Sequence, residues 1–183
     1  NLIGKKTLYY RSGKIEHVDS VYVDDQLNGE QVFYFENGAL RSKLVFKNDM
    51  PVKLEVFDQN GKNIYSANEV DGELKYRTYY PDGILEMEGL LKENKRHGKW
   101  SIYYPLGNIA QELQYNQGDQ TGLQKKYHEN GNLKEEYYCD SNKINGPYRE
   151  YFSSGKLKTS GAFRNDNQDG PWITYYSNDS VMM

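Results

Sequence analysis

Histidines, cysteines and closely spaced carboxylates are the side chains of this chain that could carry out catalysis or bind a metal. The three histidines, His17, His97 and His128, stand at unrelated positions of the sequence pattern described below. A catalytic or metal-binding histidine needs partners that converge on it, and the sequence offers none. Cys139 is the single cysteine, which excludes an internal disulfide bond and any Cys-x-x-Cys pair.

Paired glutamates could supply the acid and the base of a glycoside hydrolase. The candidates are Glu86 with Glu88, and Glu135 with Glu136. On a β-strand, adjacent residues point to opposite faces, and residues two apart share a face without a pocket around them. Glycoside hydrolysis needs two carboxyl groups that flank a cleft. We therefore expect these glutamates not to be catalytic, whereas a concave site with converging carboxylates would indicate an enzyme that acts on glycans.

One loop resembles the first half of a calcium-binding loop. Residues 165–170 place oxygen ligands at alternate positions before a glycine, but the twelfth position would be Tyr176 instead of a bidentate acid. The chain also lacks the GxSxG, HExxH, Walker A and Rossmann glycine motifs. The sequence predicts a protein that is not an enzyme and has no catalytic residues, no metal site and no cofactor.

The charges are nearly balanced, with 23 basic and 26 acidic residues and a net charge of −3. Binding to nucleic acid or to an anionic membrane by bulk charge is therefore not expected. No run of 18 apolar residues exists, so we expect no transmembrane segment. Because the chain begins with Asn1 instead of methionine, we expect that an upstream segment was removed. A cytoplasmic location and export to a periplasm or cell envelope both stay open.

A repeat of about two dozen residues runs through the chain. Its marker is a glycine that ends a two-residue step, as in Asn130 and Gly131. Asn-Gly and Asp-Gly steps between apolar and aromatic runs are typical of β-hairpins with a type I′ turn, in which both central residues have positive φ. The aligned positions are Gly13, Gly38, Gly61, Gly83, Gly107, Gly131, Gly155 and Asp179.

Two-residue turns would also fix the register of each hairpin. For the hairpin around Gly107, the predicted cross-strand pairs are Tyr104 with Ile109, Tyr103 with Ala110, and Trp100 with Leu113. Polar loops of about six residues should join consecutive hairpins, and they are short enough to require antiparallel neighbours. The clearest loops are residues 92–97, 116–121 and 164–169.

This register predicts two different faces, because successive strand residues point to opposite sides. One face is apolar and carries Trp100, Tyr104, Ile109, Leu113 and Tyr115, and again Tyr148, Phe152, Leu157, Gly161 and Phe163. The other face carries one aromatic residue per repeat and is the candidate binding face: Tyr9, Tyr34, Phe57, Tyr79, Tyr103, Tyr127, Tyr151 and Tyr175. The expected cross-strand partners of these rings are long and polar, namely Glu16, Arg41, Glu86, Lys134 and Lys158.

The predicted fold is all-β: an elongated, twisted, single antiparallel sheet of about eight sequential β-hairpins of about 24 residues each. Residues 1–183 form one repeat domain in this prediction. Its approximate units are residues 1–28, 29–51, 52–73, 74–97, 98–121, 122–145, 146–169 and 170–183.

The pattern G-x-W-x-x-Y-Y-x-x-G-x-L, present at residues 98–109 and 146–157, resembles the bacterial variant of MORN repeats. The resemblance implies an open, twisted sheet of successive hairpins, and many bacterial members carry the label of the antitoxin of a toxin–antitoxin pair. Eukaryotic MORN arrays are associated with membrane junctions and scaffolding. The sequence departs from the pattern at Asp58 and His128, where the second aromatic residue is missing, and at Asp179, where the turn glycine is missing.

We expect a non-enzymatic module that binds or scaffolds another protein through the aromatic face. One alternative is an antitoxin-like protein that neutralises a co-encoded toxin, and another is a protein that binds or acts on glycans. The tyrosine row has two open interpretations, since its rings could bind a partner or cover the backbone of neighbouring hairpins. Exposed edge strands at the ends of the array also make an edge-to-edge homo-oligomer possible.

Overall fold

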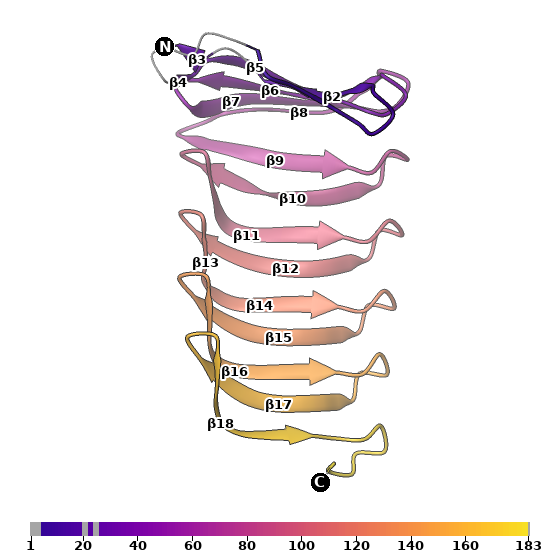
Figure 1. The fold of residues 1–183 in the computed structure, drawn as a ribbon, viewed down its shortest axis with the longest axis vertical. Coiled ribbons are helices and arrows are strands. Elements are labelled where there is room, and N and C mark those ends of the chain that lie inside the picture. Colours follow the sequence, from indigo (N-terminus) through magenta and orange to yellow (C-terminus); the bar gives the residue numbers. More distant parts are fainter. Residues whose placement is uncertain (1–4, 20–21, 24–25, 183) are drawn as a thin grey trace. The chain divides into compact units, whose positions relative to one another are not determined.

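A computed structural model describes residues 5–19, 22–23 and 26–182 of the chain. Every regular element in these residues is a β-strand, and all strand pairs are antiparallel, as the sequence predicts. Within each of the units defined below, the hairpins follow one another in chain order (Figure 1). The all-β prediction is confirmed for this part of the chain.

The prediction of a single sheet is wrong, because the strands form two large sheets and a small one. The first sheet has six strands: β1 (Thr7–Tyr9), β2 (Ile15–Val18), β5 (Gly29–Tyr34), β6 (Leu40–Lys47), β7 (Met50–Phe57) and β8 (Asn63–Asn68). The small sheet pairs β3 (Tyr22–Val23) with β4 (Gln26–Leu27).

The second sheet has ten strands. They are β9 (Glu73–Tyr79), β10 (Leu85–Lys92), β11 (Lys95–Tyr103), β12 (Ile109–Asn116), β13 (Asp119–Gln120), β14 (Gly122–Tyr127), β15 (Leu133–Asp140), β16 (Lys143–Tyr151), β17 (Leu157–Arg164) and β18 (Asn167–Thr174). The two large sheets separate between β8 and β9, which are joined by a tight turn at Asp71 and Gly72.

The glycine-containing turns differ from the predicted two-residue turns. In the hairpin of β11 and β12, the amide of Tyr104 donates to the carbonyl of Asn108 and the amide of Gly107 donates to the carbonyl of Tyr104, both at 2.8 Å. Gly107 has a φ of +87°, whereas Leu106 before it is not in the positive-φ region. These features define a type I turn followed by a glycine bulge, which needs one left-handed residue instead of two.

The glycine bulge shifts the register by one residue near each turn. Tyr103 pairs with Ile109, and Ala110 takes no partner of its own. The predicted pair of Trp100 and Leu113 is confirmed, because it lies beyond the bulge. The expected polar partners of the aromatic row are therefore wrong, since Tyr127 and Tyr151, for example, face Leu133 and Leu157. The same shift rules out a pair of Tyr104 with Ile109.

The type I′ turns occur at the opposite ends of the strands, inside the segments predicted as six-residue loops. Asn165 and Asp166 have φ values of 50° and 67°, and Ser141 and Asn142 have values of 50° and 68°. Two such residues complete a hairpin, so the strands extend into most of each predicted loop. Asparagine and aspartate tolerate this left-handed region because their short polar side chains bond locally to the backbone.

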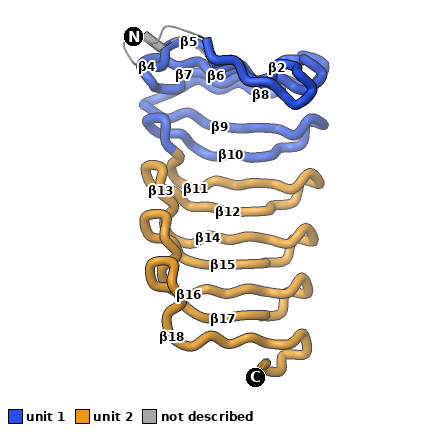
Figure 2. The backbone as a smooth tube through the Cα atoms, in the orientation of Figure 1, with its two compact units in different colours: residues 1–95 blue, residues 96–183 orange. Residues whose placement is uncertain are grey.

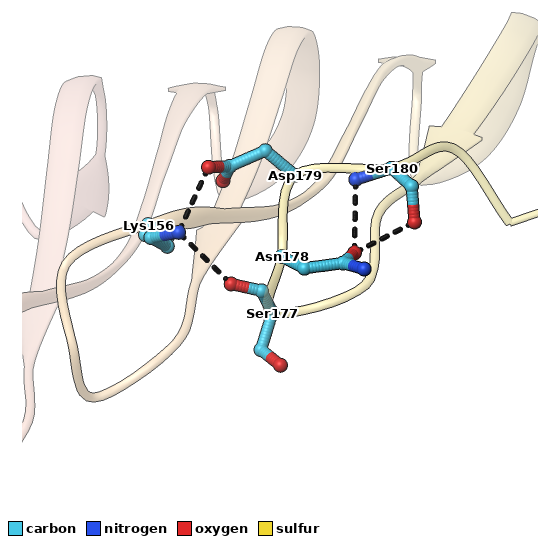
Figure 3. Close-up of polar contacts among 5 residues, drawn as sticks. All are labelled: Lys156, Ser177, Asn178, Asp179 and Ser180. Carbon is cyan, nitrogen blue, oxygen red and sulfur yellow. Dashed lines mark hydrogen bonds and ion pairs between the residues drawn. The ribbon is translucent and has the colours of Figure 1, made fainter.

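The last turn shows how the chain manages without the expected glycine. Asp179 has a φ of 69° and occupies the bulge position. Lys156 of the preceding turn donates to the carbonyl of Ser177 at 3.0 Å and to the carboxylate of Asp179 at 2.8 Å (Figure 3). Asn178 accepts from the amide and the hydroxyl of Ser180 (Figure 3). The final hairpin is thereby tied to its neighbour through side chains.

The chain divides into two compact units, residues 1–95 and 96–183 (Figure 2). In the first unit, β7 alternates apolar and polar residues, and its Leu54 and Val56 are buried with Leu74 of β9. The hydroxyl of Tyr65 on β8 donates to the carbonyl of Lys75 on β9 at 3.1 Å. The apolar face of the first sheet therefore lies over the edge of β9 and covers it.

Trp100, Leu113 and Tyr115 are buried on one sheet face of the second unit, as predicted. Ile109 and Leu157 were expected on that face, but the bulges pair them with Tyr103 and Tyr151. Trp100 is 1% exposed, and the guanidinium carbon of Arg96 lies 4.6 Å from the centre of its ring. Further along this face, Trp172 packs against Tyr148 and Phe163, with ring centroids 5.4 and 5.0 Å apart. Tyr148 stands opposite Gly161 on the neighbouring strand.

Gly161 leaves room for the Trp172 ring, so adding a methyl group there should destabilise the fold. A Cβ at position 161 would overlap the indole, with Cε3 at only 2.8 Å. We expect Gly161→Ala to lower the free energy of unfolding by about 1–3 kcal/mol in urea titrations. Ser160→Ala, on the opposite face, should change it by less than about 0.5 kcal/mol. Equal stability of Gly161→Ala and the native chain would contradict this packing.

The turn assignment predicts opposite effects of glycine at two positions. Ser141 has a φ of 50°, so Ser141→Gly should stabilise the protein by about 0.5–1 kcal/mol by removing left-handed strain. Leu106 is 81% exposed and has no positive φ, so Leu106→Gly should destabilise by about 0.5–1 kcal/mol through chain entropy. The midpoints of urea unfolding curves measure both changes. Stabilisation by Leu106→Gly would contradict the turn assignment and support the two-residue turn predicted from the sequence.

Candidate functional site

The eight residues of the predicted aromatic row all lie within the described part of the chain. Tyr9 is 60% exposed, and the other seven are half-buried. The register shift changes their cross-strand partners. In the hairpin of β11 and β12 it leaves Tyr103 on the side opposite Trp100 and Leu113. We use the name tyrosine face for this side of the second unit, defined by Lys99, Tyr103, Glu112, Leu123, Lys125, Tyr127, Glu136, Tyr138, Arg149, Tyr151 and Tyr175.

Each half-buried tyrosine in the middle of this face bonds to a glutamate of the preceding hairpin. The hydroxyl of Tyr127 donates to Glu112 at 2.7 Å, and Glu112 also forms an ion pair with Lys99. The hydroxyl of Tyr151 donates to Glu136 at 2.9 Å, and Glu136 pairs with Arg149 at 3.0 Å. The tyrosine face therefore repeats a row of one cation, one carboxylate and one phenol.

Burial and these bonds shift the pKa values of the groups in the first row. Burial, followed by the bond to Glu112, raises the pKa of Tyr127 to about 12. Hydrogen bonds from Lys99 and then from Tyr127 lower the pKa of Glu112. The phenol therefore stays neutral and the carboxylate stays charged throughout the physiological range. The charge states of Tyr127 and Glu112 are thus fixed near pH 7.

The second aromatic position of the repeat has a structural role. The hydroxyl of Tyr10 donates to the carbonyl of Tyr34, and that of Tyr104 donates to the carbonyl of Tyr127, both at 2.7 Å. His128 occupies this position in the next repeat, and its Nε2 lies 3.0 Å from the carbonyl of Tyr151. The departure at His128 thus preserves the link between consecutive hairpins.

The tyrosine face also exposes apolar surface that the sequence analysis did not single out. Tyr138 is 46% exposed and pairs with Leu123, two residues after Glu136. Leu123 also borders a hollow of about 170 Å³, which is lined by Lys99, Glu112, Leu113, Gln114, Leu123 and Lys125. The signal that could have found Tyr138 is the Tyr-Tyr step at residues 137–138, which places one ring on each face.

The other candidate residues of the sequence analysis have local structural partners. His17 Nε2 lies 2.5 Å from Asp19, and its ring stacks on Phe33. Cys139 is a buried thiol whose pKa is raised by burial. Asp166, in the calcium-like loop, accepts from the amide of Ile144 at 2.7 Å. In the part of the chain that the structure covers, no group of three or more His, Cys, Asp or Glu side chains could hold a metal ion.

The glutamate pairs proposed as an acid and a base are held in separate ion pairs. Glu86 bonds to Arg41 at 3.0 Å, and Glu88 bonds to Arg77 at 2.9 Å. Glu135 bonds to Lys126 at 2.9 Å on the face of Tyr137, whereas Glu136 lies on the tyrosine face. Neither pair converges on a common point.

Comparison with protein families identifies one profile, described as "MORN repeat variant", that matches the chain in five places. The matched segments are residues 27–48, 73–93, 96–117, 120–140 and 144–165, which together make up more than half of the chain. The profile thus matches five repeats where the glycine spacing suggested eight. The hairpin of β7 and β8, outside the matched segments, has the same glycine-closed turn.

Solved structures similar to the chain come from larger proteins. Those described as TcdB2-TccC3-Cdc42 and TcdB2-TccC3 align with it at 14% and 13% identity and TM-scores of 0.32 and 0.28. Each alignment covers 96% of this chain and 10% of the other chain, so the chain spans a small part of those proteins. No curated protein sequence matches the chain. None of the described residues form a helix long and apolar enough to cross a membrane.

The bond between Tyr127 and Glu112 predicts a measurable change in phenol ionisation. Because the folded pKa of Tyr127 is raised to about 12, its neutral hydroxyl stabilises the fold below pH 10, and this contribution is lost as the pH rises toward 12. Glu112→Gln should lower the Tyr127 pKa but leave it above 10.0, since burial is the larger cause. Carbon-13 NMR titration of labelled tyrosines measures this shift.

Glu150→Gln serves as the matched control, because Glu150 pairs with Lys158 at 2.7 Å and does not bond to Tyr127. It should leave the Tyr127 pKa unchanged. An unchanged pKa in Glu112→Gln would show that burial alone sets the ionisation of Tyr127.

Proposed function

Because the chain belongs to the MORN repeat variant family, whose repeats are generally protein- or membrane-binding modules, we propose that it binds another protein through its tyrosine face. The observation that carries this proposal is the difference between the two faces of the second unit. One face is closed by its own packing, with Trp100, Tyr115 and Tyr137 all buried. The other keeps half-buried and exposed tyrosine rings beside paired charges.

The fixed rows suit a protein contact surface. Tyrosines supply large, rigid contact area at low entropic cost, and rings held by hydrogen bonds lose little further freedom on binding. Tyr127 and Tyr151 are held by Glu112 and Glu136, and Tyr138 adds an exposed ring on β15. The aromatic surface is therefore preorganised for binding a partner.

The charges of the face favour a protein over a polyanion. Lys99 and Arg149 are each paired with a carboxylate of the same row. Nucleic acid and anionic lipid headgroups bind to clusters of cations without such partners. A protein surface with alternating charges and apolar groups complements the rows better.

In this proposal the chain acts by binding and not by catalysis, and its repeats provide an extended surface for scaffolding. Support comes from the candidate glutamates, which form separate ion pairs instead of a converging pair. The antitoxin role, the glycan-related role and the homo-oligomer stay predictions of the sequence.

Tyr138 is the side chain whose removal should weaken partner binding most without harming the fold. It is 46% exposed, so Tyr138→Ala should cost the partner complex at least tenfold in affinity, about 1.4 kcal/mol or more. A photo-crosslinking residue at position 138 first identifies the partner in extracts of the source cells. Calorimetric titration with the purified partner then measures the loss.

Leu106→Ala is the matched control, because Leu106 is an exposed apolar residue in a turn, outside the tyrosine face. This variant should retain full affinity. If Leu106→Ala lost affinity for the partner and Tyr138→Ala kept it, the partner would bind at the turns. That result would contradict the proposal.

A further inference from the structure

The first unit contains a cleft that is separate from the tyrosine face. Its volume is about 590 Å³, and its lining comes from β8, the turn after it, β9 and β10, all within the first unit. Its lining combines a continuous run of β8 and the following turn with three residues of β9 and one of β10. These residues are Tyr65, Ser66, Ala67, Asn68, Val70, Asp71, Glu73, Lys75, Arg77 and Leu90.

The β8 edge that borders the cleft carries backbone groups that no neighbouring strand takes up. β8 is the last strand of the first sheet and pairs only with β7. The amide of Glu69 donates to the carbonyl of Val52, so residues 69, 67 and 65 bond toward β7 in the antiparallel alternation. The amides and carbonyls of Ser66 and Asn68 therefore point away from β7. Within the described residues, these outward groups have no backbone partner.

The sequence of β8 also lacks the usual protection of an edge strand. Natural edge strands are commonly very short, or carry charged residues or proline that block the addition of another strand. β1, at the other end of the same sheet, has only three residues. β8 has six residues, Asn-Ile-Tyr-Ser-Ala-Asn, with neither a charge nor a proline. An open, uncharged edge of this length beside a cleft is a suitable template for an added strand.

The floor of the cleft is held in place and offers one available cation. The Arg77 guanidinium carbon lies 5.2 Å from the centre of the Tyr65 ring, and Arg77 also pairs with Glu88. Glu73 pairs with Lys92 at 3.2 Å. Lys75 is exposed, and in the part of the chain that the structure describes its ammonium has no ion-pair partner. Leu90 stands opposite Lys75 on the same face and supplies apolar surface.

We propose that the β8 edge binds an extended segment of a partner polypeptide, which adds to the first sheet as a strand next to β8. Ser66 and Asn68 provide the main-chain hydrogen bonds, as in other cases of strand addition. Alternate side chains of the segment point down onto the β9–β10 face, where an apolar residue contacts Leu90 and an acidic residue reaches Lys75. This site is independent of the tyrosine face, so each can fail without the other.

The test uses the 183-residue chain and two synthetic hexapeptides with blocked ends. The acidic probe is Thr-Val-Glu-Val-Thr-Val, and its basic counterpart has lysine in place of glutamate. Amide hydrogen exchange is followed by NMR at millimolar peptide. The acidic probe should slow exchange of the Ser66 and Asn68 amides at least tenfold and bind a few-fold more tightly than the basic probe. Lys75→Glu should reverse that preference.

Backbone changes separate strand addition from other kinds of binding. Ser66→Pro removes an outward amide without touching the ladder to β7, and it should abolish binding of the acidic probe. Ser66→Ala keeps the amide and should bind as the native chain does. Because a proline could also disturb the strand, two further versions of the acidic probe are N-methylated at alternate residues, one version on each edge of the extended peptide. Only the version that is methylated on the edge facing β8 should fail to protect the Ser66 and Asn68 amides from exchange.

Three results would overturn the proposal. The first is no protection of Ser66 and Asn68 by either probe. The second is equal binding of both N-methylated versions, which would show that the cleft takes up a small molecule or side chain without strand pairing. The third is protection that appears without peptide and rises with protein concentration, which would identify the occupant as a second copy of this chain.

Discussion

The strands of the second unit end alternately in two kinds of turn, and the other features of that unit depend on this alternation. At one side, a type I turn with a bulge residue such as Gly107 closes the hairpin. At the other side, two residues with positive φ, such as Asn165 and Asp166, reverse the chain without a bulge. The bulge adds one residue per repeat to one strand and fixes which side chains point to each face. The face of Trp100 and the tyrosine face both follow from that register.

The two faces of the second unit are stabilised in different ways. A single sheet has no second layer to cover it, so its apolar face must be buried by its own large side chains and by long polar ones. Trp172 does this by filling the space above Gly161, and Arg96 does it by lying across Trp100. The tyrosine face is instead held by bonds between repeats, such as Tyr127 with Glu112. Aromatic rings there remain accessible.

The sequence was sufficient to predict the period, the strand content and the separation of the aromatic residues into two faces. It was insufficient for the turn types, because an Asn-Gly step such as that of Asn130 and Gly131 fits both a type I′ turn and a glycine bulge. The difference lies in the φ of the residue before glycine, which is a property of the folded hairpin. The polar segments that do form type I′ turns contain few glycines. A search based on Asn-Gly and Asp-Gly steps therefore does not detect these turns.

The break into two sheets and the tyrosine–glutamate bonds could not be read from single repeats. The alternation around Leu54 and Val56 on β7 shows that this strand has a buried face, but not that β9 lies beneath it. The bond of Tyr127 to Glu112 joins residues of different hairpins, so a prediction within one hairpin gives the wrong partner. Exposure of Tyr138 likewise depends on how neighbouring strands stack.

The cover that the first sheet places over β9 gives the array a polarity. The strand order of the second sheet runs from β9 to β18, and an apolar layer of described residues lies over β9. Duplicating or deleting a 24-residue hairpin near β18 would leave Leu54, Val56 and Leu74 undisturbed, whereas the same event at β9 would break their packing. Related genes should therefore differ in length mainly through gain or loss of hairpins away from β9.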